Sequence, residues 1–286
     1  MSIYEKYLKY KSKYISSRLK RQHGGKSKDD NFLSLNIGKI NTKEYKVYLV
    51  KYENKKILPL SPFHDIPLWF IEQEKIANMV VEIPKGTDLK LEINKEIVLN
   101  PITYDIKNDK IRIVGMKYPA NYGALPQTWE NPNITNELTN AKGDNDPIDA
   151  MDISNIISET GSVIRVKILG VFAMIDEGET DWKIICINIK DCNANKINNL
   201  DDIEEILPNK LKEIFEFLRD YKIPDGKPPN KFAFDGKPQD KNLAIKVIEE
   251  THLEWQKLIK EIIPSNNISL LNTTNCSNNL IKFNSN

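Results

Sequence analysis

The stretch GDNDPIDAMD, residues 143–152, places four aspartates within nine positions and includes no lysine or arginine: Asp144, Asp146, Asp149 and Asp152. Like charges this close raise one another's pKa values and repel, unless water or a cation neutralises them. Carboxylate oxygens are hard ligands that suit Mg²⁺, Mn²⁺ or Ca²⁺. The stretch therefore indicates either a solvated acidic turn or a site for a divalent metal.

The spacing of the aspartates favours convergence on one ion. Pro147 biases Asp146 toward an extended backbone, so we expect the side chains of Asp144 and Asp146 to project to the same side. A calcium-binding hand is excluded, because Asp149 stands where that loop requires glycine and Asn155 where it requires a bidentate glutamate. Surface loops collect Asp and Asn, so these residues alone leave the solvated turn open.

The composition is that of one large globular domain. The chain has 286 residues, of which 40% are hydrophobic. No apolar run is long enough to span a membrane and no apolar segment follows the basic start, so neither a membrane anchor nor secretion is expected. The cysteines, Cys186, Cys192 and Cys276, are odd in number and form no C-x-x-C pair, which favours a reducing, cytoplasmic location.

Charge is distributed unevenly along the chain. Residues 1–28 hold nine Lys or Arg and one Glu, a charge of +8, whereas the rest holds 32 basic and 39 acidic residues, a charge of −7. We expect residues 1–30 to be a basic leader, helical or disordered, and the Asn- and Ser-rich residues 265–286 to be a disordered tail. An acidic body concentrates divalent cations rather than nucleic acid.

Short apolar runs between the two ends predict strands. Residues 45–50, 79–83, 89–93 and 111–114 have strand-like alternation, and residues 162–175 and 182–189 outline a long hairpin. Helical periodicity follows in residues 208–219 and again from about Asp240 until Pro264. Together these runs predict a twisted sheet or small barrel with two late helices.

Four further charged or aromatic segments lie within these elements. Taken singly, each is explained by a solvated strand face, a hairpin tip or packing at the rim of the core. Guanidinium, ammonium and phenol groups can nevertheless bind phosphate oxygens, and carboxylates can bind metal. The residues are Glu82, Lys90 and Glu92, then Arg112, Tyr118 and Tyr122, then Asp176, Asp181 and Lys183, and last Tyr221 and Lys222.

The string DNDPID resembles the D-x-D-P-x-D box of the soluble family I inorganic pyrophosphatases, and the four other segments match that family's order over about residues 33–262. ALPQTWE is similar to the eukaryotic branch, whereas the short YPANYG is closer to the bacterial one. The resemblance implies a mainly β fold, a five-stranded OB-like barrel with α-helices packed outside, in a catalytic domain of residues 31–264.

The resemblance also implies hydrolysis of pyrophosphate to two phosphates by metal-activated water, with several Mg²⁺ per site and Mn²⁺ or Zn²⁺ as substitutes. It assigns Asp146 to catalysis. It assigns metal binding to Asp144, Asp149, Asp176, Asp181, Glu82 and Glu92. It assigns substrate binding to Lys90, Arg112, Tyr118, Tyr122, Lys183, Tyr221 and Lys222.

The same resemblance implies a homodimer with no membrane partner. The dimeric branch builds part of its interface from an Arg-Trp pair and a longer loop, whereas this chain has Lys85 and Gly86 there and lacks the loop. Two alternatives stay open: a family member that has lost catalysis and serves as an interaction protein, and a nucleic-acid binder built from an OB-like barrel and the basic leader. The acidic strand faces disfavour the second.

Overall fold

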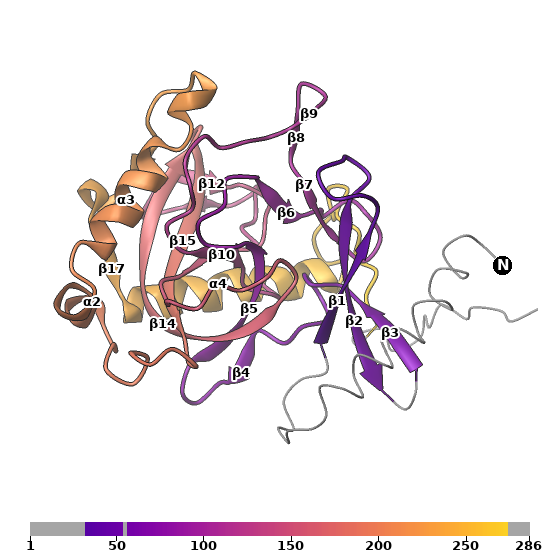
Figure 1. The fold of residues 1–286 in the computed structure, drawn as a ribbon, viewed down its shortest axis with the longest axis horizontal. Helices are drawn as coiled ribbons and strands as arrows, with labels where there is room; N and C mark the ends of the chain where they lie inside the picture. The colour runs from indigo at the N-terminus through magenta and orange to yellow at the C-terminus, as the bar shows by residue number, and fades with distance from the viewer. Residues whose placement is uncertain (1–31, 54–55, 274–286) are drawn as a thin grey trace, which may run out of the picture.

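The computed structural model describes residues 32–53 and 56–273. The predicted basic leader, residues 1–30, and residues 274–286 of the predicted tail lie outside the described part. Strands dominate the described residues, and the three α-helices among them lie in the C-terminal half (Figure 1). The predicted mainly β fold with flanking helices is confirmed. Among the described residues, no helix combines the length and the apolar composition needed to cross a membrane.

The smaller of two main sheets has five strands in the order β1-β2-β7-β6, with β3 paired to β2. All its pairs are antiparallel. A separate two-stranded pair joins β8 to β9. The bounds are β1 Phe32–Ile37, β2 Lys46–Glu53, β3 Lys56–Leu60, β6 Leu91–Ile93, β7 Ile102–Tyr104, β8 Ile106–Lys107 and β9 Lys110–Ile111.

In the larger sheet five strands close a ring of hydrogen-bonded pairs, because β14 pairs with both β5 and β15, and β10 and β13 bridge β5 to β15. The β13–β15 pair is parallel. This partly closed ring of five strands stands where a five-stranded barrel was expected. The bounds are β4 Trp69–Ile71, β5 Ile76–Ile83, β10 Asn121–Ala124, β11 Thr135–Asn136, β12 Ala141–Gly143, β13 Asp149–Asp152, β14 Val163–Asp176, β15 Glu179–Asn188, β16 Lys231–Phe232 and β17 Gln239–Asp240.

The β14–β15 hairpin turns at Glu177 and Gly178, whose φ angles are +51° and +94°. Two left-handed residues match the right-handed twist of the flanking strands, so this turn closes the long hairpin tightly. It pairs Asp176 with Glu179 and leaves Asp181 and Lys183 on one face of β15. The turn therefore fixes where the acids of the hairpin lie.

The helices lie outside the sheets. They are α2 Leu200–Ile206, α3 Lys210–Asp220 and α4 Lys241–Ile259, with short 3₁₀ turns at Ile223–Asp225 and Phe234–Gly236. In Figure 1, α4 runs lengthwise across the ring, with α2 and α3 at one end of the molecule and the smaller sheet at the other. The periodicity predicted α3 and α4, while α2 was missed. The side chain of Asp240 caps α4 by accepting from the N–H of Leu243 at 3.0 Å.

Two further segments differ from the sequence prediction. Residues 111–114 form little strand: β9 ends at Ile111, and a single bridge joins Ile113 to Leu89. Residues 265–273, which the composition assigned to a disordered tail, pack on the domain. Ile268 is 3% exposed and belongs to the main core cluster, and the backbone of Ser269 bonds the carbonyl of Lys95 at 2.8 Å.

Candidate active site

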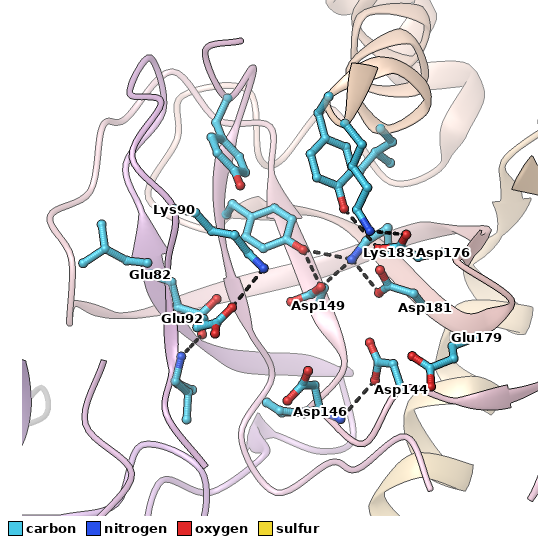
Figure 2. A pocket seen from close by; sticks show the side chains of 18 of the residues that line it. Glu82, Lys90, Glu92, Asp144, Asp146, Asp149, Asp176, Glu179, Asp181 and Lys183 are labelled. Carbon is cyan, nitrogen blue, oxygen red and sulfur yellow. Dashed lines mark hydrogen bonds and ion pairs between the residues drawn. The ribbon is translucent and has the colours of Figure 1, made fainter. Parts of the chain in front are cut away.

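A pocket of about 200 Å³ opens between the ring and the α3 region. Every predicted site residue except Arg112 lines it (Figure 2). Nine carboxyl groups and three lysines share this lining, so acids outnumber bases in the pocket. They are Glu82, Glu92, Asp144, Asp146, Asp149, Asp176, Glu177, Glu179 and Asp181, with Lys90, Lys183 and Lys222.

The acidic box connects β12 to β13. Asn145 adopts φ +71°, so the segment is a turn rather than the extended run that Pro147 suggested. The N–H of Asp146 donates to the Asp144 carboxylate at 3.0 Å, and the indole N–H of Trp129 donates to the Asn145 side chain at 3.0 Å. Asp144 and Asp146 still face the same pocket, although the turn, not strand alternation, places them there.

The fourth aspartate of the box has a structural position. Asp152 is fully buried and does not line the pocket. Its carboxylate accepts from the side chains of Asn121 and Ser154, at 2.9 and 2.8 Å, and from the N–H of Asn188 at 2.8 Å. These donors satisfy the buried carboxylate and fasten the end of β13 to its neighbours.

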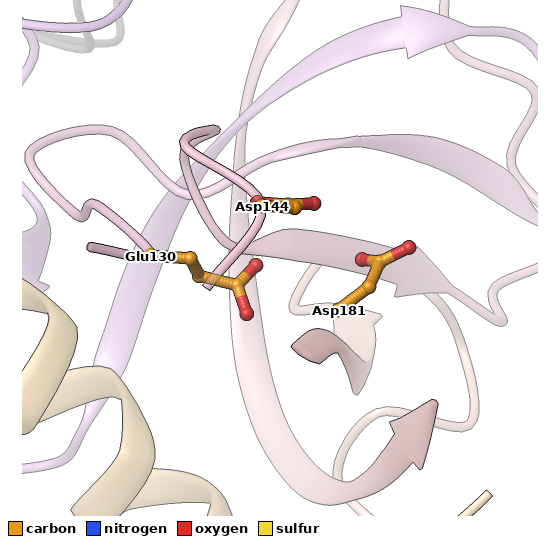
Figure 3. A group of neighbouring side chains, drawn as sticks. All are labelled: Glu130, Asp144 and Asp181. Atoms are coloured by element: carbon orange, nitrogen blue, oxygen red, sulfur yellow. The ribbon is translucent and has the colours of Figure 1, made fainter. Parts of the chain in front are cut away.

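Glu130 joins the box from the preceding segment. One oxygen from each of Glu130, Asp144 and Asp181 lies within 4.8 Å of the others, and the three side chains lie close together (Figure 3). Gly143 permits this approach, because a Cβ there would lie 2.4 Å from the Glu130 carbonyl carbon. Burial, followed by the charge of Asp144, raises the pKa of Glu130 well above its ordinary value.

The sequence does not mark Glu130. It follows the buried Trp129 and has no acidic partner at a metal-ligand spacing. Its side chain is one of the polar groups that the described residues leave incomplete: Oε1 accepts from the N–H of Trp182 at 3.1 Å, and Oε2 has no partner. The available signal was an acid directly after a tryptophan, since a charge beside a buried side chain needs compensation.

Asp149 and Asp181 share Lys183. The parallel register of β13 and β15 puts Asp149 opposite Lys183, whose Nζ lies 2.5 Å from a carboxylate oxygen of each aspartate. The hydroxyl of Tyr122 donates to Asp149 and accepts from Lys183 at 2.9 Å. Burial raises the pKa of Tyr122, so the phenol stays protonated and remains a donor.

The mouth of the β14–β15 hairpin meets the loop after α3. Lys222 forms an ion pair with Asp176, and the hydroxyl of Tyr221 donates to Asp176 at 3.2 Å. Lys222 also lies 3.7 Å from Glu177. The last predicted pair therefore reaches the same wall of the pocket as the hairpin acids.

The opposite wall comes from β5 and β6. Lys90 Nζ lies 2.9 Å from Glu92 and 3.5 Å from Asp105. Burial lowers the pKa of Lys90, but the negative charges of Glu92 and Asp105 outweigh the effect of burial. The pKa of Lys90 therefore lies above its ordinary value. Glu82 is 4% exposed and accepts from the N–H of Ile93 at 2.7 Å. Burial, followed by the charge of Asp149, raises the pKa of Glu82 well above its ordinary value.

The two remaining residues lie at the edge of this arrangement. Tyr118 lines the pocket and is buried against Phe217, with ring centroids 4.7 Å apart. Arg112 is the predicted residue that does not line it. Its guanidinium lies 2.9 Å from Asp225 and 3.2 Å from Asp105, which ties the segment before Val114 to the loop after α3.

Comparisons with known proteins point to one family. The family model described as inorganic pyrophosphatase matches residues 79–256. An inorganic pyrophosphatase of Dictyostelium discoideum is 53% identical over 83% of this chain and 84% of its own length, and one of Zygosaccharomyces bailii is 49% identical over 83% and 84%.

Solved structures give the same result. The inorganic pyrophosphatase of Schistosoma japonicum superposes with a TM-score of 0.80 at 45% identity, covering 84% of this chain and 86% of that one. A truncated vacuolar soluble pyrophosphatase of Trypanosoma cruzi, solved in complex with PPi, superposes with a TM-score of 0.77 at 39% identity, covering 81% and 92%. The matched family model, these identities and their coverage show that the chain belongs to the inorganic pyrophosphatase family.

Proposed function

We propose that this chain hydrolyses inorganic pyrophosphate to two phosphates, using Mg²⁺ and a water activated by it. The observation that carries the proposal is the pocket in which nine carboxylates and three lysines converge in a member of this family. Pyrophosphate is highly anionic and would be repelled by carboxylates alone. A pocket of this composition therefore requires cations between the protein and its substrate.

The residues present fit such cations. Oxygen donors suit Mg²⁺, with Mn²⁺ or Zn²⁺ as substitutes, and Glu130 Oε2 is a buried oxygen without a protein partner in the described chain. Asp144, Asp149 and Asp181 would hold the ions nearest the attacking water, while Asp176, Glu92 and Glu82 would hold further ones. When bound, such ions lower the pKa of water and neutralise the leaving phosphate.

The remaining groups divide between proton transfer and positioning. Asp146 would orient the attacking water and accept its proton, because it lines the pocket beside Asp144 and its side chain is 48% exposed. The phosphates would be held by Lys90, Lys183, Lys222, Tyr118, Tyr122 and Tyr221, with Arg112 at the edge. Positioning of this kind removes much of the entropic part of the barrier.

A phosphate-release assay tests the proposal. Purified protein is incubated with pyrophosphate across a titration of Mg²⁺, with an EDTA control and a Ca²⁺ arm. We expect release that depends on Mg²⁺ and is inhibited by Ca²⁺, whose larger coordination shell holds carboxylates with looser geometry. Absence of phosphate release at every Mg²⁺ concentration would exclude the activity.

We further propose that the protein acts as a homodimer in the cytoplasm, with no membrane or nucleic-acid partner. The free cysteines Cys186 and Cys192 support a reducing compartment. Association needs a surface that differs from the branch's Arg-Trp pair. Gly86 occupies one of those positions, and a Cβ built there would meet nothing within 4 Å.

A further inference from the structure

Lys95 contacts Asp146, although the sequence of the acidic box gives no sign of this contact. It lies in the loop between β6 and β7, about fifty residues before the box. Its Nζ donates to Asp146 Oδ1 at 2.7 Å and to the backbone carbonyl of Asn145 at 3.1 Å. The lysines that line the pocket pair with other acids: Lys90 with Glu92, Lys183 with Asp149 and Asp181, and Lys222 with Asp176.

The loop that carries Lys95 is held from two sides. The carbonyl of Lys95 accepts from the N–H of Ser269 at 2.8 Å and from the side chain of Asn100 at 2.9 Å. Asn100 is fully buried and adopts φ +44°, a conformation that asparagine tolerates better than most residues. Its other amide atom accepts from the hydroxyl of Ser61 at 2.7 Å. The carbonyl of Lys95 and the side chain of Asn100 therefore both bond to protein groups.

The C-terminal segment that reaches Lys95 is itself anchored. Ile268 is 3% exposed, and the carbonyl of Ser269 lies 3.1 Å from His64 Nε2. Four residues later the N–H of Thr273 donates to Asp65 at 2.8 Å. The burial of Ile268 and the hydrogen bonds of Ser269 and Thr273 therefore hold the C-terminal segment in place, and this segment in turn holds the backbone of Lys95.

Asp146 has particular need of such support. It stands in a turn after the left-handed Asn145, and its side chain is 48% exposed. A carboxylate in that position loses rotamer freedom only through contacts made by its own oxygens. Lys95 binds one oxygen, which leaves the other free to face a water. A base displaced by about 1 Å loses on the order of 10²-fold in rate.

Resting on the proposed function, in which Asp146 is the base, we propose that Lys95 is a positioning residue that holds the Asp146 carboxylate in its working orientation. A purely electrostatic role is the main alternative. A lysine that only attracted pyrophosphate would affect the KM, because the anion feels every positive charge near the pocket. A positioning lysine affects the kcat, because it acts on the transition state.

The test compares Lys95→Met, which keeps the length of the side chain, with Lys95→Arg, which keeps a donor. The kcat and the KM for pyrophosphate are measured at saturating Mg²⁺, together with the melting temperature. We expect Lys95→Met to lower the kcat about 10- to 100-fold with the KM changed less than about threefold, and Lys95→Arg to recover most of the loss. Lys75→Met, which removes a surface ion pair with Glu249, is the matched control.

A double variant makes the test specific. In an Asp146→Asn background, Lys95→Met should lower the kcat less than about twofold further, since the group it positions is already absent. Full multiplication of the two losses, or a Lys95→Met kcat within about twofold of the wild type, overturns the proposal. An inactive wild type instead overturns the hydrolase function. An unimpaired Asp146→Asn variant removes the base on which Lys95 acts.

Discussion

Lys183 and Asp181 stand two residues apart on β15 and form an ion pair of 2.5 Å on the buried wall of the pocket. Side chains two residues apart on a strand point to the same face, and burial removes the water that would screen their charges. Burial nevertheless outweighs the lysine and raises the pKa of Asp181 to about 7. Burial in this wall therefore makes the carboxyl group of Asp181 harder to ionise.

The pKa of Asp181 predicts how stability depends on pH. An aspartate in an unfolded chain has a pKa of about 3.9, so the folded value is raised. Such a group contributes stability that is fully present below about pH 4 and is lost as the pH rises through about 7. In EDTA, the free energy of unfolding should therefore fall between about pH 4 and 7.

Urea denaturation in EDTA at several pH values measures this effect, and Asp181→Asn isolates it. The variant should show a flatter profile than the wild type over the same interval, because its amide does not titrate. Burial also raises the pKa values of Asp144 and Glu82, so some slope should persist. Parallel profiles for the two proteins would contradict the assignment to Asp181.

Glu130 should contribute to Mg²⁺ affinity. Its carboxylate completes the group with Asp144 and Asp181, and its Oε2 has no protein partner in the described chain. Metal that binds only the folded state raises the melting temperature by mass action. We expect Glu130→Gln to need about 10- to 100-fold more Mg²⁺ for the same rise, the usual effect of losing a supporting group.

Thermal shift with a Mg²⁺ titration measures that affinity without turnover. Glu159→Gln, which changes an exposed glutamate outside the pocket lining, is the control. An unchanged Mg²⁺ dependence in Glu130→Gln would show that this buried acid does not support the metal.

The sequence predicted the acids because local spacing determines much of their placement. Asp181 and Lys183 share a strand face, and Lys90 and Glu92 share another, so alternation alone brings each pair together. The ring of strands was expected through the family resemblance, since short alternating runs do not specify their own pairing order. The alternation of apolar and polar residues shows which side chains share a face of a strand. The closure of the ring depends instead on contacts between strands that are distant in the sequence.

The groups that the sequence missed depend on those distant contacts. Glu130 reaches Asp144 because Gly143 allows the two backbones to approach, and Lys95 reaches Asp146 through a loop fixed by Ser269. Composition suggested disorder for residues 265–273, because polar residues bury little apolar surface. Backbone hydrogen bonds and one apolar anchor, Ile268, proved sufficient to order them.

Asp146→Asn should retain the fold and lower the kcat by about 10²- to 10⁴-fold, the usual contribution of a positioned base. The change is nearly isosteric, and the side chain is half exposed, so the melting temperature should stay close to that of the wild type. Asp109→Asn, at an exposed position paired with Lys43, is the control. Near-normal turnover of the Asp146 variant would remove it from the role of base.

If the protein forms the proposed homodimer, its interface should be rebuilt near Gly86. Ile113 is 58% exposed, and the N–H of the adjoining Val114 donates to the carbonyl of Asp88 at 2.9 Å, so Ile113 stands on a segment bonded to the one that follows Gly86. Buried apolar anchors usually dominate association. Ile113→Asp should therefore promote dissociation, whereas Ile262→Asp, 68% exposed elsewhere, should not.

Light scattering across a dilution series, from about 100 to about 0.1 µM, covers the micromolar end of the range in which interfaces of ordinary size dissociate. A monomer mass at every concentration of the wild type, or a hexamer mass, would show that the proposed dimer is wrong.

Arg112→Lys should chiefly weaken substrate binding. The guanidinium reaches Asp105 and Asp225 at once, at 3.2 and 2.9 Å, and a planar fork can turn toward a phosphate while keeping one of these partners. A lysine offers a single charged point and cannot bridge them. We expect the KM for pyrophosphate to rise about tenfold, equivalent to one charge-assisted hydrogen bond, with the kcat changed less.

Steady-state kinetics of Arg112→Lys beside Arg219→Lys, a surface change next to Asp220, separate the two constants. Asp225→Asn supplies the complementary variant: it frees Arg112 from one acid, so the KM should fall or stay level rather than rise. If both Arg112→Lys and Asp225→Asn leave the KM at the wild-type value, Arg112 only ties the two loops together and takes no part in holding the substrate.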